Sequence, residues 1–308
     1  HLETTGPSLP YAACLLELLE RKIKNRDNFF GNFGIDPMSS LSINGSLISN
    51  YKLLHERISD LTEYSTQEFI NTRVFNVKTL AYHNAGCSEA QELAIAMSTA
   101  LNYVRLLTEN GFDTNKAFQQ IAFTLTCDTD FFLTISKFKA IRLLWQNIAQ
   151  ECGTDTKNYS APTYAITAPR MMATADPWTN ILRCTTACFA ATISGADAIT
   201  VLPFDYHENK TSQNDMSRRI SRNTQLILQD ESHLDQVIDP SAGSYLVESL
   251  TTELAKKSWE IFTKIEKTGG IQESLFNGFI QNKIEKVKKS RATAIARRKK
   301  FLTGVNDY

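Results

Sequence analysis

The amino-acid sequence predicts an α/β fold, and three observations lead to that class. The chain has 308 residues, of which 42% are hydrophobic and 21% charged, so it can bury a large core. Short runs rich in β-branched and aromatic residues alternate with longer amphipathic segments. No long linker or low-complexity segment interrupts this alternation. The pattern is typical of βα units that wind into a barrel or a doubly wound parallel sheet.

Six segments have the length and composition of strands, the last one more weakly than the others. They are residues 29–35, 73–82, 120–127, 163–169, 198–202 and 237–239. A segment of helix length separates most of these strands from the next, as in consecutive βα units.

The helix boundaries carry recognisable capping chemistry. Ser88 and Gln91 predict a capping box, because the hydroxyl and the amide can each satisfy an unpaired backbone N–H group. The helix that follows has one apolar stripe and is expected to end at Asn110 and Gly111. Further helices are expected over residues 130–152, 177–195 and 216–229, with one or two more across 251–298.

The strand at 120–127 carries different side chains on its two faces. One face is large and apolar, with Ile121, Phe123 and Leu125, while the other is small and mildly polar. The small set comprises Ala122, Thr124 and Thr126 and recurs at Thr163, Ala165, Thr167, Ala198 and Thr200. If it faces a barrel axis, it can line a channel for an elongated ligand, with Thr124, Thr126 and Thr167 as candidate substrate contacts. The strand propensity of threonine and the close packing of alanine explain the same pattern without a ligand.

Charge and cysteine usage exclude several classes of protein. Lysine plus arginine equal aspartate plus glutamate at 33 each, so no net field attracts nucleic acid or an anionic membrane. Cations gather between Lys283 and Lys300, which we interpret as the solvated face of a terminal helix, with an anionic ligand or partner as the alternative. The six cysteines form no CxxC pair, and no apolar stretch approaches the ~20 residues that cross a bilayer. These features indicate a reducing, cytoplasmic compartment, although the start at His1 leaves open an upstream transit peptide.

Common catalytic motifs are absent from the sequence. GxGxxG, GxxxxGK[ST], HExxH and GxSxG do not occur. Cys184 and Cys188 lie one helical turn apart on an apolar segment, and we interpret them as buried small side chains rather than as half of a metal site. Asp205-Tyr206-His207 follows a strand and is interpreted as a solvated loop. We therefore expect no metal ligands.

The run from Tyr82 to Cys87 lies between an expected strand and a capped helix. In βα folds the loops that follow the C-terminal ends of the strands carry the catalytic groups. A phenol beside an imidazole can hydrogen-bond a carbonyl or a carboxylate, and His83 can donate a proton near neutral pH. Tyr82 and His83 are therefore the candidate catalytic pair, and a packed, hydrogen-bonded lid is the alternative.

Several ordered segments resemble the methylmalonyl-CoA mutase family. They include Thr79-Leu-Ala-Tyr-His-Asn-Ala-Gly86, Phe131-Phe-Leu-Thr-Ile135, Asp176-Pro-Trp-Thr-Asn-Ile-Leu-Arg183, Arg218-Arg-Ile-Ser-Arg-Asn-Thr-Gln225 and Val237-Ile-Asp-Pro-Ser-Ala-Gly-Ser-Tyr245. Residues 304–308 resemble the end of the family's barrel domain. The resemblance implies a (β/α)8 TIM-type barrel threaded by a CoA chain, in an enzyme that rearranges acyl-CoA skeletons with adenosylcobalamin.

Three departures from the family's catalytic pattern stand out. The DxHxxG motif of the cobalamin domain is missing, and the nearest run, Asp205-Tyr-His-Glu-Asn-Lys210, has lysine in place of glycine. Asn84-Ala85-Gly86 replaces a stretch that contains glutamine, a form associated with the non-catalytic small subunit. Ile166 stands where catalytic chains present a glutamine to the substrate, and isoleucine cannot hydrogen-bond a thioester carbonyl. The resemblance therefore implies that this chain binds no cofactor.

The likeness begins partway into the barrel, so the expected fold is a (β/α)8 barrel without its first one or two βα units. We expect the barrel domain over residues 1–280 and a basic terminal helix with the start of a linker over 281–308. An open barrel exposes strand edges, which predicts an upstream portion or a partner chain.

The leading hypothesis is a structural, small-subunit-like component of methylmalonyl-CoA mutase. It implies a heterodimer with a catalytic large subunit that binds adenosylcobalamin and interconverts methylmalonyl-CoA and succinyl-CoA in propionate metabolism. In the alternative, this chain itself holds acyl-CoA against Tyr82 and His83 while another polypeptide brings cobalamin. A third hypothesis is a CoA-binding or chaperone-like module without a mutase partner.

Overall fold

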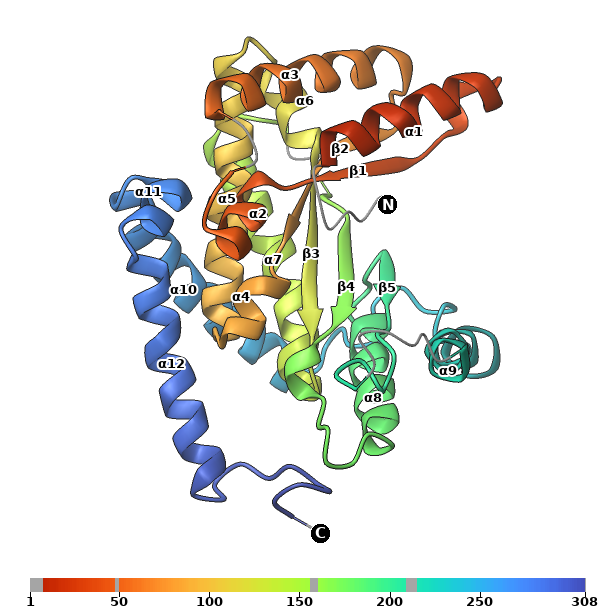
Figure 1. Ribbon diagram of the computed structural model, residues 1–308, viewed down its shortest axis with the longest axis vertical. Coiled ribbons are helices and arrows are strands. Elements are labelled where there is room, and N and C mark those ends of the chain that lie inside the picture. Colours follow the sequence, from red (N-terminus) through yellow and green to blue (C-terminus); the bar gives the residue numbers. More distant parts are fainter. Residues whose placement is uncertain (1–7, 48–49, 156–159, 209–214, 308) are drawn as a thin grey trace.

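The computed structural model describes residues 8–47, 50–155, 160–208 and 215–307. One parallel sheet of five strands, in the order β1-β2-β3-β4-β5, forms its centre (Figure 1). The strands are β1 Gly31–Ile35, β2 Thr72–Lys78, β3 Ile121–Cys127, β4 Thr163–Thr167 and β5 Ala198–Thr200. The sheet is curled, and the fold is an α/β fold consistent with a partial TIM barrel.

Helices connect the strands and cover the sheet. They are α1 Ser8–Lys22, α2 Pro37–Asn44, α3 Tyr51–Glu68, α4 Leu80–Ala85, α5 Glu89–Glu109, α6 Thr114–Gln119, α7 Phe131–Glu151, α8 Thr179–Ile193, α9 Asp215–Leu226, α10 Tyr245–Lys267, α11 Gly270–Phe276 and α12 Phe279–Ala296. Within the described residues there are also two 3₁₀ turns, Arg26–Asn28 and Pro169–Met171, and a π-helical turn, Ile227–Glu231. α10 packs on α5 and α7 as a further layer, and α12 lies on the outside of the molecule (Figure 1).

The capping box at the start of α5 is confirmed. The Ser88 hydroxyl accepts from the Gln91 backbone N–H, and the Gln91 side chain accepts from the Ser88 N–H at 3.0 Å. This reciprocal pair fixes where α5 begins, directly after the turn that follows α4.

The outer face of the sheet packs against α5 and α7 through aromatic side chains. Phe75 of β2 stacks on Tyr103 of α5 with ring centroids 4.4 Å apart. Phe123 of β3 meets Trp145 of α7 edge to face at 5.3 Å. Each such pair contributes about 0.5–1.5 kcal/mol beyond its buried area, so these contacts fix α5 and α7 against the strands that precede the candidate site.

The inner face of the sheet carries polar side chains, but only some of the residues predicted for this face lie on it. Thr124 pairs in register with Tyr164, and Thr126 with Ile166, so Tyr164 and Ile166 share the inner face with the two threonines. The expectation that Thr163, Ala165 and Thr167 continue this face is wrong. They have the opposite parity and lie on the side of α8, where Cys184 of that helix hydrogen-bonds Thr167. Small strand residues are needed there because buried alanines and cysteines of α8 approach closely.

Two further predictions of secondary structure are wrong. Residues 237–239 form no strand, because they lie in a loop where the Ile238 side chain is 98% exposed and has no sheet to pack against. The strand predicted over 73–82 ends at Lys78, so Tyr82 and His83 lie on α4. Thr79 begins that helix, and a six-residue helix is too short to show a period in the sequence.

The predicted burial of Cys184 and Cys188 is confirmed. The prediction that residues 205–207 form a solvated loop is partly wrong. Cys184 and Cys188 are buried, and burial raises the pKa of their thiols to about 12 and about 11. In the predicted solvated loop, Tyr206 and His207 are exposed, but Asp205 is buried. His207 Nε2 lies 2.9 Å from the Pro169 carbonyl oxygen. None of the helices in the described part of the chain combines the length and hydrophobicity that a bilayer crossing requires.

Candidate functional site

The short helix α4 separates two environments. Its residues Leu80, Ala81 and Asn84 line a cavity on the inner face of the sheet. Tyr82 and His83 are buried and do not line this cavity: His83 lies next to α5 and the end of β3, whereas Tyr82 lies against Ser42 of α2 and near Asp36. This division follows from helical geometry, since residues i, i+1 and i+4 share a face.

The cavity has a volume of about 570 Å³ and a mixed lining. Its walls include Asp36, Lys78, Asn84, Thr124, Ile166, Thr200 and Tyr206. Among the predicted substrate contacts, Thr124 faces this cavity and donates its hydroxyl hydrogen to Asn76 Oδ1 at 2.9 Å. Thr167 lies on the opposite face of the sheet, where its hydroxyl accepts from the Leu202 backbone N–H. Contact of any of these residues with a substrate stays a prediction.

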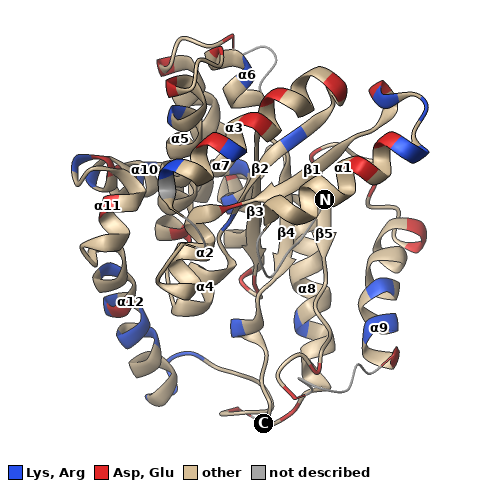
Figure 2. Ribbon diagram, turned by 45° about the horizontal axis from the view of Figure 1, so that its top comes forward, with Lys and Arg blue, Asp and Glu red and all other residues tan. Residues whose placement is uncertain are grey.

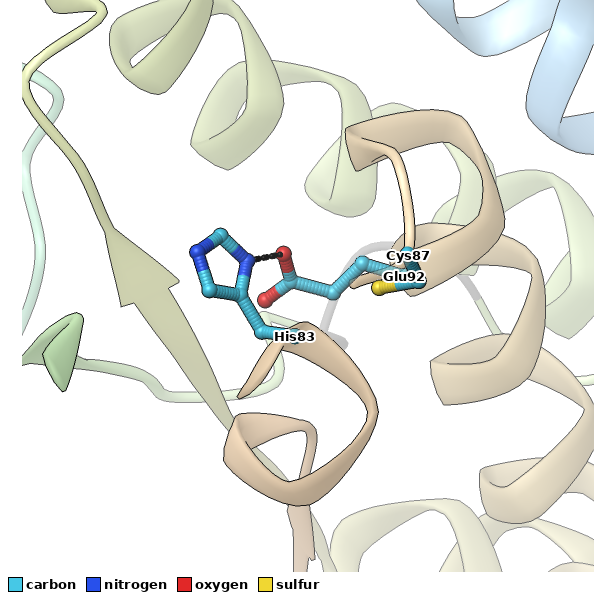
Figure 3. Close-up of side chains that lie close together, drawn as sticks. All are labelled: His83, Cys87 and Glu92. Carbon is cyan, nitrogen blue, oxygen red and sulfur yellow. Dashed lines mark hydrogen bonds and ion pairs between the residues drawn. The ribbon is translucent and has the colours of Figure 1, made fainter. Parts of the chain in front are cut away.

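Thr126, the third predicted contact, belongs to a buried polar cluster around Glu92. The Glu92 carboxylate accepts from the Thr79 hydroxyl at 2.6 Å, from the Thr126 backbone N–H at 2.9 Å and from the Thr126 hydroxyl at 2.8 Å. His83 Nδ1 lies 3.0 Å from Glu92 Oε2 (Figure 3). The cluster therefore joins the end of β2, helix α4, helix α5 and strand β3.

Lys137 supplies the compensating positive charge. Its Nζ donates to Glu92 Oε2 at 2.8 Å and to the Thr126 hydroxyl at 3.1 Å, and the side chain is only 1% exposed. An ion pair removed from water in this way needs all its hydrogen-bonding groups satisfied, and the threonine hydroxyls meet that need here.

On the other side of its ring, His83 lies at the C-terminal end of strand β3. Its Nε2 lies 3.3 Å from Asp128 Oδ2, directly after β3. Arg170, in the 3₁₀ turn after β4, donates to the same Asp128 oxygen at 3.1 Å and to the carbonyls of His83 and Cys87. Arg291 of α12 also donates to the Cys87 carbonyl, and to that of Gly86 at 2.9 Å. Two guanidinium groups thus bind the carbonyl end of α4, where the helix dipole favours positive charge.

The ionisation of the cluster follows from its contacts. Burial alone raises the pKa of Glu92, but the charges of Lys137 and His83 outweigh it and hold that pKa well below its usual range. Asp128 behaves likewise, because hydrogen bonding by His83 and the charges of His83 and Arg170 overcome burial and lower its pKa. Burial disfavours the charged form of Lys137, yet Glu92 more than offsets it and the pKa is raised. Both carboxylates and the ammonium are therefore charged at neutral pH.

Two other groups of the run after β2 are held uncharged. Burial raises the pKa of the Tyr82 phenol, and burial also raises that of the Cys87 thiol well above its usual range. His83, Cys87 and Glu92 place ligand atoms within 4.8 Å of one another, a spacing that suits a metal ion. The Lys137 ammonium contacts the same Glu92 oxygen as His83 and supplies a positive charge at this place.

The sequence pattern identified His83 and Thr126 but missed Glu92, Lys137, Asp128 and Arg170. A signal was available for two of them. Glu92 and Lys137 occupy helices whose apolar stripes predict burial, and fully buried charged residues are rare unless paired. Their partnership could not be read, because 45 residues separate them in the chain.

Comparison with known proteins agrees with this architecture. The family model described as methylmalonyl-CoA mutase matches residues 1–308. The chain is 37% identical over 294 residues to the methylmalonyl-CoA mutase small subunit of Streptomyces virginiae, covering 96% of this chain and 47% of that protein. It is 41% identical over 239 residues to the probable methylmalonyl-CoA mutase small subunit of Mycobacterium bovis, and the match covers 77% of this chain and 38% of that protein.

The methylmalonyl-CoA mutase small subunit of Propionibacterium freudenreichii subsp. shermanii is 34% identical over 297 residues, which cover 96% of this chain and 46% of that protein. The chain thus spans less than half the length of these curated relatives. Because the family model matches it from end to end, the chain belongs to the methylmalonyl-CoA mutase family.

Proposed function

We propose that the chain is a non-catalytic, small-subunit component of methylmalonyl-CoA mutase. Its partner is a catalytic large subunit, which binds adenosylcobalamin and interconverts methylmalonyl-CoA and succinyl-CoA. One observation carries the proposal: Tyr82 and His83 are buried, and neither is among the residues that line the cavity. A general acid or a hydrogen-bond donor must reach the group on which it acts, and neither side chain reaches this cavity.

The cavity wall supports the same conclusion. Ile166 contributes an apolar side chain to the lining, at the position where a catalytic chain is expected to present a glutamine amide. A hydrocarbon side chain cannot stabilise a thioester oxygen, so the wall lacks a donor where the chemistry of the family needs one.

The described histidines lack the sequence setting of the family's cobalt ligand. His83 is moreover enclosed between two carboxylates. None of the histidines stands in a DxHxxG loop, so we place the cofactor on the large subunit.

The fold proposal is a (β/α)8 barrel of which this chain forms a part. β1 and β5 lie at the two ends of the sheet order and so offer edges for further strands. We place the barrel portion at residues 1–280 and the basic helix with the start of a linker at 281–308, and we propose a cytoplasmic location, in keeping with six unpaired cysteines.

A second candidate function rests on the cavity itself. Its volume of about 570 Å³ and its polar groups, among them Lys78, Asn84 and Thr200, suit part of an elongated acyl-CoA. In that case this chain holds the substrate, and the large subunit contributes the cobalamin alone.

One experiment separates the two functions. The chain is co-expressed with a methylmalonyl-CoA mutase large subunit, and complex formation, corrin absorbance and turnover are measured for the wild type, Thr200→Trp and Thr186→Trp. Thr200 lines the cavity, whereas Thr186 receives the same substitution on the exposed face of α8. We expect a stable heterodimer whose turnover is the same in all three, with corrin retained by the large subunit.

Loss of turnover in Thr200→Trp alone would support the acyl-CoA function. Failure of the two chains to co-elute, or retention of corrin by this chain after dialysis, would overturn the subunit proposal.

A further inference from the structure

The cluster around His83 continues as one row of ionisable side chains. In order, its members are Lys137, Glu92, His83, Asp128, Arg170 and Glu89. Successive members are 2.8, 3.0, 3.3, 3.1 and 3.6 Å apart, and the row runs from the fully buried Lys137 to side chains that are 16–18% exposed. His83 occupies the third position, between two carboxylates.

Hydrogen-bond chemistry restricts the state of that imidazole. An ionised carboxylate only accepts hydrogen bonds, and a neutral imidazole has one ring nitrogen without a hydrogen. Whichever nitrogen of a neutral His83 lacks the hydrogen would place its lone pair against Glu92 at 3.0 Å or against Asp128 at 3.3 Å. The Thr126 hydroxyl, 2.8 Å from Nδ1, has one hydrogen and two Glu92 oxygens within 2.9 Å that compete for it.

The surrounding charges alone do not assign the state of the ring. Besides His83 the row holds two cations and three anions, and Arg291 lies beside it as a third cation. The other groups that face the ring region are Cys87, whose thiol is protonated, and Arg291, which donates to the carbonyls of Gly86 and Cys87. Glu92 already pairs with Lys137, and Asp128 with Arg170, so the hydrogen-bond geometry at the ring assigns the state of His83.

We infer that His83 is a doubly protonated imidazolium that serves as a structural cation, clamped between Glu92 and Asp128. Both ring N–H groups are engaged within the protein, so neither is free to protonate or hydrogen-bond a substrate. Glu92 and Asp128 act as positioning residues, and Lys137 and Arg170 keep them ionised. The clamp ties α4 to α5, to β3 and to the turn after β4, and so fixes one wall of the cavity.

The inference deepens the proposed non-catalytic role and rests on that function only for its biological meaning. Its test is therefore made on the ring of His83. The full chain is labelled with ring-15N histidine, and ring 1H–15N correlations are recorded at pH 8, where an exposed histidine is neutral. The signal lost in His83→Gln identifies His83, and the exposed His233 serves as the internal reference.

We expect His83 to show two protonated nitrogens with similar shifts. In Asp128→Asn the imidazolium pattern of His83 should be lost at pH 8. The matched control Asp239→Asn removes a carboxylate from a surface pair with Lys139 and should leave the pattern unchanged.

An unprotonated ring nitrogen on His83 in the wild type would overturn the inference, and this spectrum decides even if Asp128→Asn does not fold. Persistence of the imidazolium pattern in a folded Asp128→Asn would overturn the role of Asp128. A heterodimer that forms with a neutral His83 refutes the clamp alone, whereas an imidazolium in a chain that binds no large subunit refutes the subunit proposal alone.

Discussion

Lys137 Nζ and Glu92 Oε2 lie 2.8 Å apart, and neither side chain is more than 1% exposed. The two residues come from α7 and α5, which flank β3 on the outer side of the sheet. Glu92 also receives hydrogen bonds from the ends of β2 and β3 through Thr79 and Thr126. The pair thus stabilises the point where three βα units meet, directly behind the candidate site.

Removing the cation should strongly destabilise the fold. Lys137→Met leaves Glu92 buried without its counter-charge, and we expect a loss of about 3–5 kcal/mol in the free energy of unfolding, measured by urea denaturation. The double variant Glu92→Gln/Lys137→Met should recover part of this loss because both charges are gone. Lys139→Met is the control: its partners Asp239 and Glu248 are about half exposed, so its loss should be below about 1 kcal/mol. Equal losses in the two single variants would contradict the role of Lys137.

Stability should fall in acid because of Glu92 and Asp128. Their folded pKa values lie below the ordinary values of 4.5 and 3.8, so the unfolded state takes up protons first as the pH drops. The stabilisation is fully present above those ordinary values and is lost as the pH falls through the folded pKa values. Melting temperatures recorded from pH 7 down to pH 3 test this.

The Asp36 carboxyl changes stability with pH in the opposite direction, because burial raises its pKa. A variant is therefore needed to isolate the contribution of Glu92. Glu92→Gln should be less stable than the wild type at pH 7 and should lose less stability on acidification. Parallel pH profiles for the two proteins would show that Glu92 does not cause the acid sensitivity.

Gly86 should not tolerate alanine. It ends α4 with a φ of 111°, and an added Cβ would lie 2.8 Å from Lys288 Cβ on α12. Gly111 is a matched control, since its φ is 87° but an added Cβ would meet no atom within 4 Å. We expect Gly111→Ala to lose about 1 kcal/mol from backbone strain and Gly86→Ala to lose clearly more, as measured by urea denaturation. A loss in Gly86→Ala no larger than in the control would mean that α12 does not press on this turn.

Arg291 should hold α12 to the candidate site. It donates to the carbonyls of Gly86 and Cys87, whereas Lys289, on the same helix, is 76% exposed and pairs with Glu285 of its own helix. Arg291→Ala should speed amide hydrogen exchange in α12 relative to the wild type, and Lys289→Ala should not. Unchanged exchange in α12 of the arginine variant would indicate that apolar contacts alone fix the helix.

Much of the fold could be predicted from the sequence because its signals are local. The alternation of strand and helix, the capping box at Ser88 and the burial of Cys184 and Cys188 each depend on residues within a few positions of one another. The prediction of a strand at 237–239 is wrong for a physical reason. Apolar residues in a short run predict burial, but the loop leaves these side chains exposed. The prediction of which face of the sheet Thr163, Ala165 and Thr167 occupy is wrong because small residues suit close packing by α8 as well as they suit an open channel.

The candidate site was only half predictable. Tyr82 and His83 could be located by their place after a strand, but the sequence could not show which side of α4 faces the cavity. The charges around His83 come from Glu92, Asp128, Lys137 and Arg170, and tertiary packing alone brings most of them together. The distinction between a catalytic and a structural histidine depends on these partners.

Turnover by the heterodimer with His83→Gln tests whether His83 is structural or catalytic. Complex formation is verified first by co-elution, so that a folding defect is not mistaken for lost catalysis, and kcat and KM for methylmalonyl-CoA are then measured. We expect values within about twofold of wild type, because a histidine clamped between two carboxylates takes no part in the reaction. A fall in kcat of about a hundredfold or more in the intact complex, the size expected for a lost general acid, would contradict this expectation.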